Sequence, residues 1–392
     1  MLKLLTLRFH RYVLVVPEDP SDKLYTNWTK TGSINGKPFV NPVLNNTGDD
    51  PSTAWKLNGD ENAEWRIIGN QQCKPEGGNP VYGSKDFVSW YKVGCSTLMA
   101  GDCPTFFPLP KLYPGTEHYL NEAHGPLPNH VHKSGGHGGD QFQVGTWTDG
   151  KPGSASEGGT PGAWEILAGT DTVFQDKGTT HASKDFYDPV KDRRILWVWG
   201  TVPSGIQTVP RELNYHPGLK RIVWNPTEEV AGLRSPTPIA TLPLTPLKAD
   251  TPVSLKAAGA SDIELFFQKP TKATTLQVQL GMSGSCFLNF VPGAETADCG
   301  FNTTGGHKGK GGQDKLPLLG DETYLSMRIL IDSSVGECYW QEGRVAMTVE
   351  LGADQGDDTS VTITSSGADG AIVNATAWQM NDIHTTVQDV LS

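Results

Sequence analysis

The chain of 392 residues contains no run of about 20 apolar residues, so its sequence offers no membrane-spanning helix. Apolar residues rarely recur at the spacing of three and four that marks an amphipathic helix. The cysteines form no Cys-x-x-Cys pair, which argues against a zinc ribbon or a thioredoxin-like centre. The first eleven residues also lack the apolar core of a signal peptide. We therefore expect no metal, no cofactor and no membrane segment.

The charge balance narrows the class of partner. There are 32 basic and 43 acidic residues, which gives a formal net charge of -11. Phosphate backbones and anionic lipid surfaces would repel such a chain. Neither nucleic acid nor a membrane surface is an expected partner.

The composition and the apolar pattern predict an all-β protein. The sequence has 45 glycines and 28 prolines, which suits many turns joining short strands. Apolar and polar residues alternate over 141–147 and 327–332, and residues 194–199 read as a more buried strand. The tetrapeptide Ser-Lys-Asp-Phe occurs at 84–87 and at 183–186. The two copies begin 99 residues apart, which would correspond to two repeats of about 50 residues each. A repeat of that length is typical of propeller blades.

A domain boundary is predicted after a short helix. Asn225 is the expected N-cap, followed by Pro226 and by Glu228 in capping-box position, and the helix should run to about Arg234. Four prolines then fall within residues 236–246, which can be neither helix nor central strand. We predict a propeller-like domain over 1–234, a Pro-rich linker over 235–250 and a β-sandwich over 251–392.

Two cysteines are placed so that they could form a disulfide. Cys286 and Cys299 flank a turn-rich segment, and a short disulfide or two free thiols are the alternatives.

Two short acidic turns carry the chemical information. Asp49, Asp50 and Pro51 precede Ser-Thr-Ala-Trp, and Asp102, Cys103 and a proline precede Thr-Phe-Phe-Pro. In sequence and order the two turns resemble two signatures of glycoside hydrolase family 32, the invertases and fructan hydrolases. There, Arg-Asp-Pro precedes Thr-Ala-Trp and Glu-Cys-Pro precedes Asp-Phe-Phe.

The resemblance continues along the chain and implies a fold. The segment 176–197 is its most specific block, and residues 225–234 resemble the family's linker helix. The family fold is a five-bladed β-propeller joined to a β-sandwich. Its first signature, Trp-x-Asn-Asp-Pro-Asn-Gly, carries the nucleophile, and no Asn-Asp-Pro triplet occurs in this sequence. By that register the chain begins after most or all of the first blade.

The resemblance also assigns roles to residues. Asp50 takes the position of the carboxylate that stabilises the transition state, and Asp102 that of the acid/base, where the family has Glu. Asp49 replaces the family's Arg and is expected among the residues that bind the substrate. Trp55 and Cys103 are expected near the sugar, and Asp176 is expected to bind a second sugar unit. Read without the family, Asp50, Asp102 and Asp176 are each turn residues.

Four histidines, His124, His130, His132 and His137, lie in a Gly- and Pro-rich stretch. A metal site and a solvated loop are the alternatives, and the loop is favoured because no acidic or cysteine ligand pattern accompanies them.

The expected function is therefore β-fructofuranosidase-type hydrolysis of sucrose or fructans, impaired by the missing nucleophile motif and the shortened acid/base. A retaining mechanism needs two opposed carboxyl groups. The alternatives are a non-catalytic fructan- or sucrose-binding protein and a fragment of an active enzyme. The expected partner in each case is a small carbohydrate.

Overall fold

The computed structural model is built almost entirely of antiparallel strands, which confirms the all-β prediction. The residues it describes are 3–7, 11–45, 47–48, 50–56, 62–74, 77–96, 101–121, 125–136, 139–150, 162–168, 170, 172–202, 204–281, 283–303, 311–351, 359–367, 371–383, 386 and 388.

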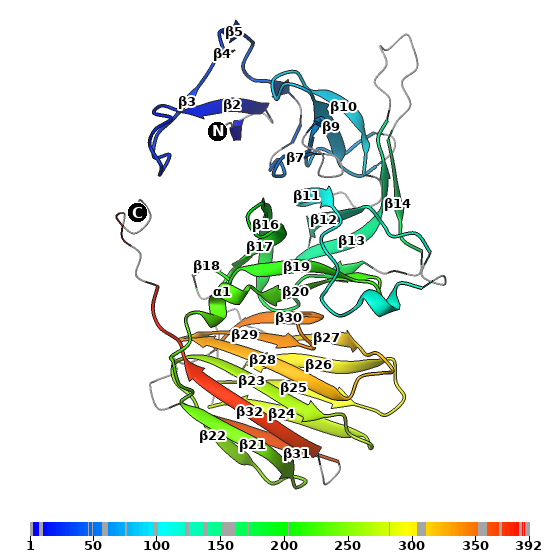
Figure 1. Cartoon of the computed structure of the whole chain (residues 1–392), viewed down its shortest axis with the longest axis vertical. Coiled ribbons are helices and arrows are strands. Elements are labelled where there is room, and N and C mark those ends of the chain that lie inside the picture. Colours follow the sequence, from blue (N-terminus) through cyan, green and yellow to red (C-terminus); the bar gives the residue numbers. More distant parts are fainter. Residues whose placement is uncertain are drawn as a thin grey trace.

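The N-terminal part contains four successive sheets of four or five strands, which follow one another around an arc (Figure 1). The first contains β1 (Lys3–Leu7), β2 (Arg11–Pro17), β3 (Trp28–Lys30) and β6 (Leu44–Asn45), beside a hairpin of β4 (Ser33–Ile34) and β5 (Lys37–Pro38). The second contains β7 (Trp55–Lys56), β8 (Trp65–Ile68), β9 (Pro80–Ser84) and β10 (Tyr91–Cys95).

The third and fourth sheets carry most of the residues that concern function. The third contains β11 (Asp102–Pro108), β12 (His130–Gly136), β13 (Gly139–Thr148), β14 (Ala163–Ile166) and β15 (Val173–Phe174), and the 3-10 helix η2 (Glu117–Tyr119) lies between β11 and β12. The fourth contains β16 (Thr180–Asp188), β17 (Arg193–Gly200), β18 (Ile206–Gln207), β19 (Arg211–His216) and β20 (Arg221–Pro226).

Two six-stranded sheets pack face to face in the C-terminal part. One has the order β21 (Ala240–Leu247), β32 (Ala371–Gln379), β23 (Ala260–Gln268), β28 (Tyr324–Asp332), β29 (Val335–Trp340) and β30 (Val345–Glu350). The other has the order β22 (Val253–Lys256), β31 (Ser360–Ser366), β24 (Thr274–Leu280), β25 (Gly284–Phe290), β26 (Thr296–Thr303) and β27 (Gly312–Pro317). Their inward side chains form one apolar core, as alternation along sandwich strands requires.

The α-helix near the predicted domain boundary is shorter than predicted. Helix α1 covers Glu228–Ala231 and begins after Thr227, whereas Asn225 belongs to β20. The prediction of Asn225 as the N-cap is therefore wrong. This helix is not long and apolar enough to span a membrane.

The predicted linker is largely a strand. Residues 240–247 form β21, which pairs only with β32 at the edge of its sheet, and the register shifts between Leu242 and Thr245. An edge position tolerates prolines because one side of the strand needs no ladder hydrogen bonds. The sandwich thus begins before residue 251.

The repeated tetrapeptide is not a structural repeat. Residues 84–87 end β9 and enter a turn that Asp86 caps by accepting bonds from Val88 N and Ser89 N, whereas residues 183–186 lie within β16. The two copies do lie two sheets apart, but at different places in those sheets.

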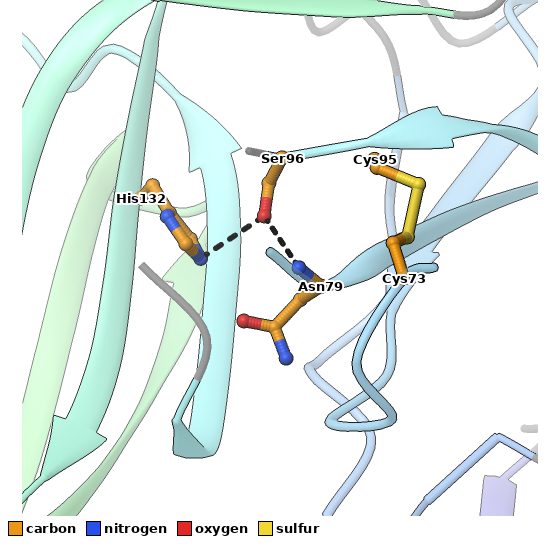
Figure 2. Close-up of a disulfide and its surroundings, with 5 residues drawn as sticks. All are labelled: Cys73, Asn79, Cys95, Ser96 and His132. Atoms are coloured by element: carbon orange, nitrogen blue, oxygen red, sulfur yellow. Dashed lines mark hydrogen bonds between the residues drawn. A yellow bond between two sulfur atoms is a disulfide. The ribbon is translucent and has the colours of Figure 1, made fainter. Parts of the chain in front are cut away.

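A disulfide joins Cys73 to Cys95, at the end of β10 (Figure 2). Beside it, Ser96 Oγ accepts a hydrogen bond from Asn79 N and lies 3.5 Å from His132 Nε2 of the third sheet. Cys286 and Cys299 are both free and buried, so the second of the two alternatives for that pair holds. They face the apolar core from adjacent strands, and their strand partners are Phe301 and Leu288.

Arg211 joins the fourth sheet to the sandwich. Its guanidinium donates to Asp176 Oδ2 at 2.9 Å, to Glu337 Oε2 at 3.0 Å and to Tyr339 at 2.9 Å. All four side chains are buried, and apolar residues of both parts pack around them. Removing the cation would leave two carboxylates buried without their partner, which is far costlier than the pair itself is stabilising.

We therefore expect Arg211→Met to lower the free energy of unfolding by about 3–5 kcal/mol, as measured by denaturant titration. Lys191→Met is the matched control, because Lys191 pairs with Glu228 and Glu229 on the surface and its loss should hardly move the midpoint. An equal, small effect of both variants would contradict this account of the junction.

Candidate active site

The structure brings the two acidic turns together. Asp50 follows β6, and Asp102 opens β11, 52 positions later in the sequence. The Cys103 thiol donates a hydrogen bond to Asp50 Oδ2 over 3.6 Å. The Asp102 side chain beside it is exposed. We call Asp50, Asp102, Cys103 and Lys184 the acidic-turn site.

A β-bulge shapes the second turn. Asp102 pairs with Gly135 and Thr105 with Lys133, so β11 holds one residue more than β12 across this interval. Cys103, inside the bulge, has φ 47°, and Asp50 has φ 50°, a region that side chains other than glycine rarely adopt. A Cβ on Gly135 would lie 2.8 Å from the Asp102 carbonyl, so β12 needs glycine there. The bulge leaves Cys103 and Pro104 without ladder partners between these two pairs.

Lys133 hydrogen-bonds the backbone of this bulge. Its fully buried ammonium donates to the Cys103 carbonyl at 2.6 Å, to Asp140 Oδ2 at 2.9 Å and to the Ser183 carbonyl at 2.9 Å. An ammonium has three donors, so all are used. Ser183 Oγ also donates to Asp140. One buried cation thereby connects the third sheet to β16.

β16 also reaches the first turn. The Lys184 ammonium donates to the Pro51 carbonyl at 2.9 Å, and the Thr53 hydroxyl donates to the Asp185 carbonyl at 2.7 Å. Asp185 itself is buried and paired with Arg194. The strand therefore contacts the residues next to both acidic turns.

Burial and charge set the state of two groups at the site. Burial, assisted by the negative charge of Asp50, raises the pKa of the Cys103 thiol to about 11. The thiol thus stays protonated at neutral pH and keeps its donor. Removal from water lowers the pKa of Lys184, and the charge of Lys133 adds to this effect, whereas Cys103, Asp50 and Asp185 oppose it.

Two other predicted site residues are buried in the structure, and a third lies outside the described residues. Trp55 is buried in the apolar core of the second sheet, with its ring 5.5 Å from that of Phe106. Asp176 is buried at the sandwich junction, where Gly178 N, Thr348 N, Thr348 Oγ1 and Arg211 occupy its carboxylate. Both side chains are buried, and their roles in sugar binding stay predictions. Asp49 lies outside the described residues.

The histidines are not a solvated loop. His130 and His132 lie in β12 with no exposed surface, and the ring of Phe106 stacks on that of His130 at 5.0 Å. The expectation of a loop is wrong for these two, because the glycines and prolines flank a strand. His124 and His137 lie outside the described residues. In the described part of the chain, no three His, Cys, Asp or Glu side chains are grouped as metal ligands.

Sequence reasoning missed Lys133, Asp140 and Lys184. Lys133 and Asp140 sit in strands with no local motif, and only contacts between distant segments give them a role. Lys184 was visible in the repeated tetrapeptide, yet nothing in the sequence indicated its neighbour Pro51.

A pocket of about 530 Å³ lies apart from the acidic turns, between the fourth sheet and the sandwich. Residues such as Val209, Val230, Leu330 and Ile331 line it, and none of the acidic-turn site residues does. Its lining is mainly apolar and includes Glu337, the carboxylate that pairs with Arg211.

We expect acid to destabilise the fold through the buried histidines. Burial lowers the pKa of His132 to about 3 and that of His130 to about 4, below the ordinary value of 6.5. Above pH 6.5 they are neutral in both states, and below it the unfolded chain binds protons that the folded chain does not. Each histidine should therefore cost about 2 kcal/mol of stability between pH 7 and pH 5. His132→Gln should remove that share of the slope in unfolding measured against pH; an unchanged slope would contradict the buried neutral state.

Comparison with known proteins places this geometry in a family. Residues 14–226, more than half of the chain, match the model of the glycosyl hydrolases family 32 N-terminal domain. The β-fructofuranosidase, insoluble isoenzyme CWINV6, of Arabidopsis thaliana is 29% identical over 248 residues, which are 57% of this chain and 42% of that protein. The vacuolar acid β-fructofuranosidase 4 of the same plant is 26% identical over 94% of this chain and 64% of its own length. The chain thus spans less than two thirds of these relatives.

Solved structures support the same fold. Fructan 1-exohydrolase IIa from Cichorium intybus superposes with a TM-score of 0.72 at 21% identity, over 97% of this chain and 81% of that one. The exo-inulinase from Aspergillus awamori gives 0.67 at 15% identity, over 95% and 74%. The architecture is that of the family's propeller followed by a sandwich, and the chain belongs to glycosyl hydrolase family 32.

Proposed function

We propose that this chain binds a fructosyl sugar, from sucrose or a fructan, at the acidic-turn site. The observation that carries the proposal is the contact between Cys103 and Asp50, which sets an exposed Asp102 beside a second carboxylate. Solved relatives support the substrate class, since fructan 1-exohydrolase IIa is known with 1-kestose and a Bombyx mori β-fructofuranosidase with sucrose.

We further propose that hydrolysis by these 392 residues is slow. Retention requires an attacking carboxylate about 5–5.5 Å from the proton donor. Asp140 and Asp185 are near the site but buried and paired with Lys133 and Arg194, so neither is available to attack. The sequence has no Asn-Asp-Pro triplet to supply another.

The residue at the proton-donor position should slow hydrolysis further. Asp102 is one methylene shorter than the Glu of the family signature, and a displacement of about 1 Å can cost on the order of a hundredfold in rate. The proposed roles are proton donor for Asp102 and sugar-binding carboxylate for Asp50.

A second candidate is binding without any hydrolysis. It is favoured by two departures at the turns themselves, Asp49 for Arg and Asp102 for Glu, because both weaken chemistry while leaving polar groups for a sugar.

Released fructose separates the two candidates. Purified protein incubated with sucrose and with inulin should release fructose only slowly. Turnover above a no-enzyme blank would reject the binding-only function, and turnover at the rate of an ordinary invertase would reject impaired hydrolysis.

Calorimetric titration tests the sugar site itself. We expect sucrose to bind at millimolar concentration and Asp50→Asn to weaken binding by more than about tenfold, since a charged acceptor is lost. Asp250→Asn is the matched control, because Asp250 also lies in the left-handed region, with φ 55°, but is exposed and belongs to the sandwich part of the chain. No heat with sucrose, kestose or inulin would overturn the proposal.

A further inference from the structure

Asp49 and Asp50 are consecutive acids where the family signature has an arginine before its aspartate. Two adjacent anions repel each other, and the turn loses the cation that its sequence neighbour would provide. We infer that Lys184, from the fourth sheet, supplies this positive charge and positions Asp50 for the sugar. The inference deepens the proposed function and rests on it for the sugar-binding step.

The geometry places the ammonium next to the acid in the chain. Lys184 Nζ donates to the carbonyl of Pro51, the residue that directly follows Asp50, at 2.9 Å. The Thr53–Asp185 hydrogen bond at 2.7 Å lies two residues further along. Two contacts with β16 thus fix the backbone of residues 51–53, and with it the left-handed Asp50 that precedes them.

The charges around Lys184 match this role. Asp50 and Asp185 each interact with its ammonium favourably, as does Cys103 once it is a thiolate, whereas Lys133 repels it. Lys133 cannot take the same part, because it is fully buried and its three donors are occupied.

Lys184, unlike Lys133, has N–H donors that no described residue accepts. The residue is exposed as a whole, although its ammonium is partly withdrawn from water, and within the described residues the Pro51 carbonyl is its one hydrogen-bond acceptor. An ammonium has three N–H donors. The two others are available to a ligand oxygen beside Asp50, so the lysine both positions the acid and offers donors to a hydroxyl.

The test uses two readouts on Lys184→Met, Lys184→Arg and the control Lys85→Met, whose lysine is exposed in the turn after β9. The first is the affinity for sucrose by calorimetry. The second needs no sugar: the rate at which iodoacetamide alkylates Cys103 at pH 9. The other free thiols, Cys286, Cys299 and Cys338, are buried, so native alkylation reports on Cys103 and peptide mass spectrometry confirms the site.

We expect Lys184→Met to weaken sucrose binding by about tenfold and to slow alkylation by about threefold, because the thiolate loses a stabilising positive charge. Lys184→Arg should recover most of both, and Lys85→Met should change neither. Unchanged alkylation in Lys184→Met would overturn the placement of the charge, even if sugar binding falls. A wild-type protein that binds no sugar would reject the proposed function, while the alkylation rates would still decide the role of Lys184.

Discussion

The buried ammonium of Lys133 holds in place the backbone around the acidic-turn site. Lys133 hydrogen-bonds a carbonyl in the β11 bulge, a carboxylate on β13 and a carbonyl on β16, so two sheets depend on the same charge. Such a group is tolerated in the interior only when a counter-ion and acceptors replace water. The left-handed Cys103, the exposed Asp102 and the contact with Asp50 all follow from a bulge that this lysine holds in place.

A second buried cation, Arg211, lies where the fourth sheet meets the sandwich. Arg211 gathers Asp176, Glu337 and Tyr339 from both domains, within an apolar cluster that the two domains share. Buried charges therefore fix where the sandwich sits on the fourth sheet, and apolar packing alone would define that contact less sharply. Asp176 contributes to this junction, where Arg211 and Thr348 bond its carboxylate.

The acidic-turn site combines retained and altered features of its family. The turns, the thiol and the strand that contacts them are assembled, and the proposed sugar site rests on that assembly. The altered positions, Asp49 and Asp102, change charge and reach. The exposed Lys184 is the structural feature that offsets the first of these changes, and no comparable feature offsets the second among the described residues.

The sequence alone determined the strand content, the turn chemistry and the likeness to the family, because alternation, proline and glycine positions and short motifs act locally. The residue ranges 141–147, 194–199 and 327–332 are strands for that reason. The tertiary structure decided which distant groups meet: Cys73 with Cys95, Lys133 with Asp140 and Ser183, Lys184 with Pro51. It also decided that Trp55 and Asp176 are buried. Such pairings depend on how separate sheets pack, and no local pattern encodes that packing.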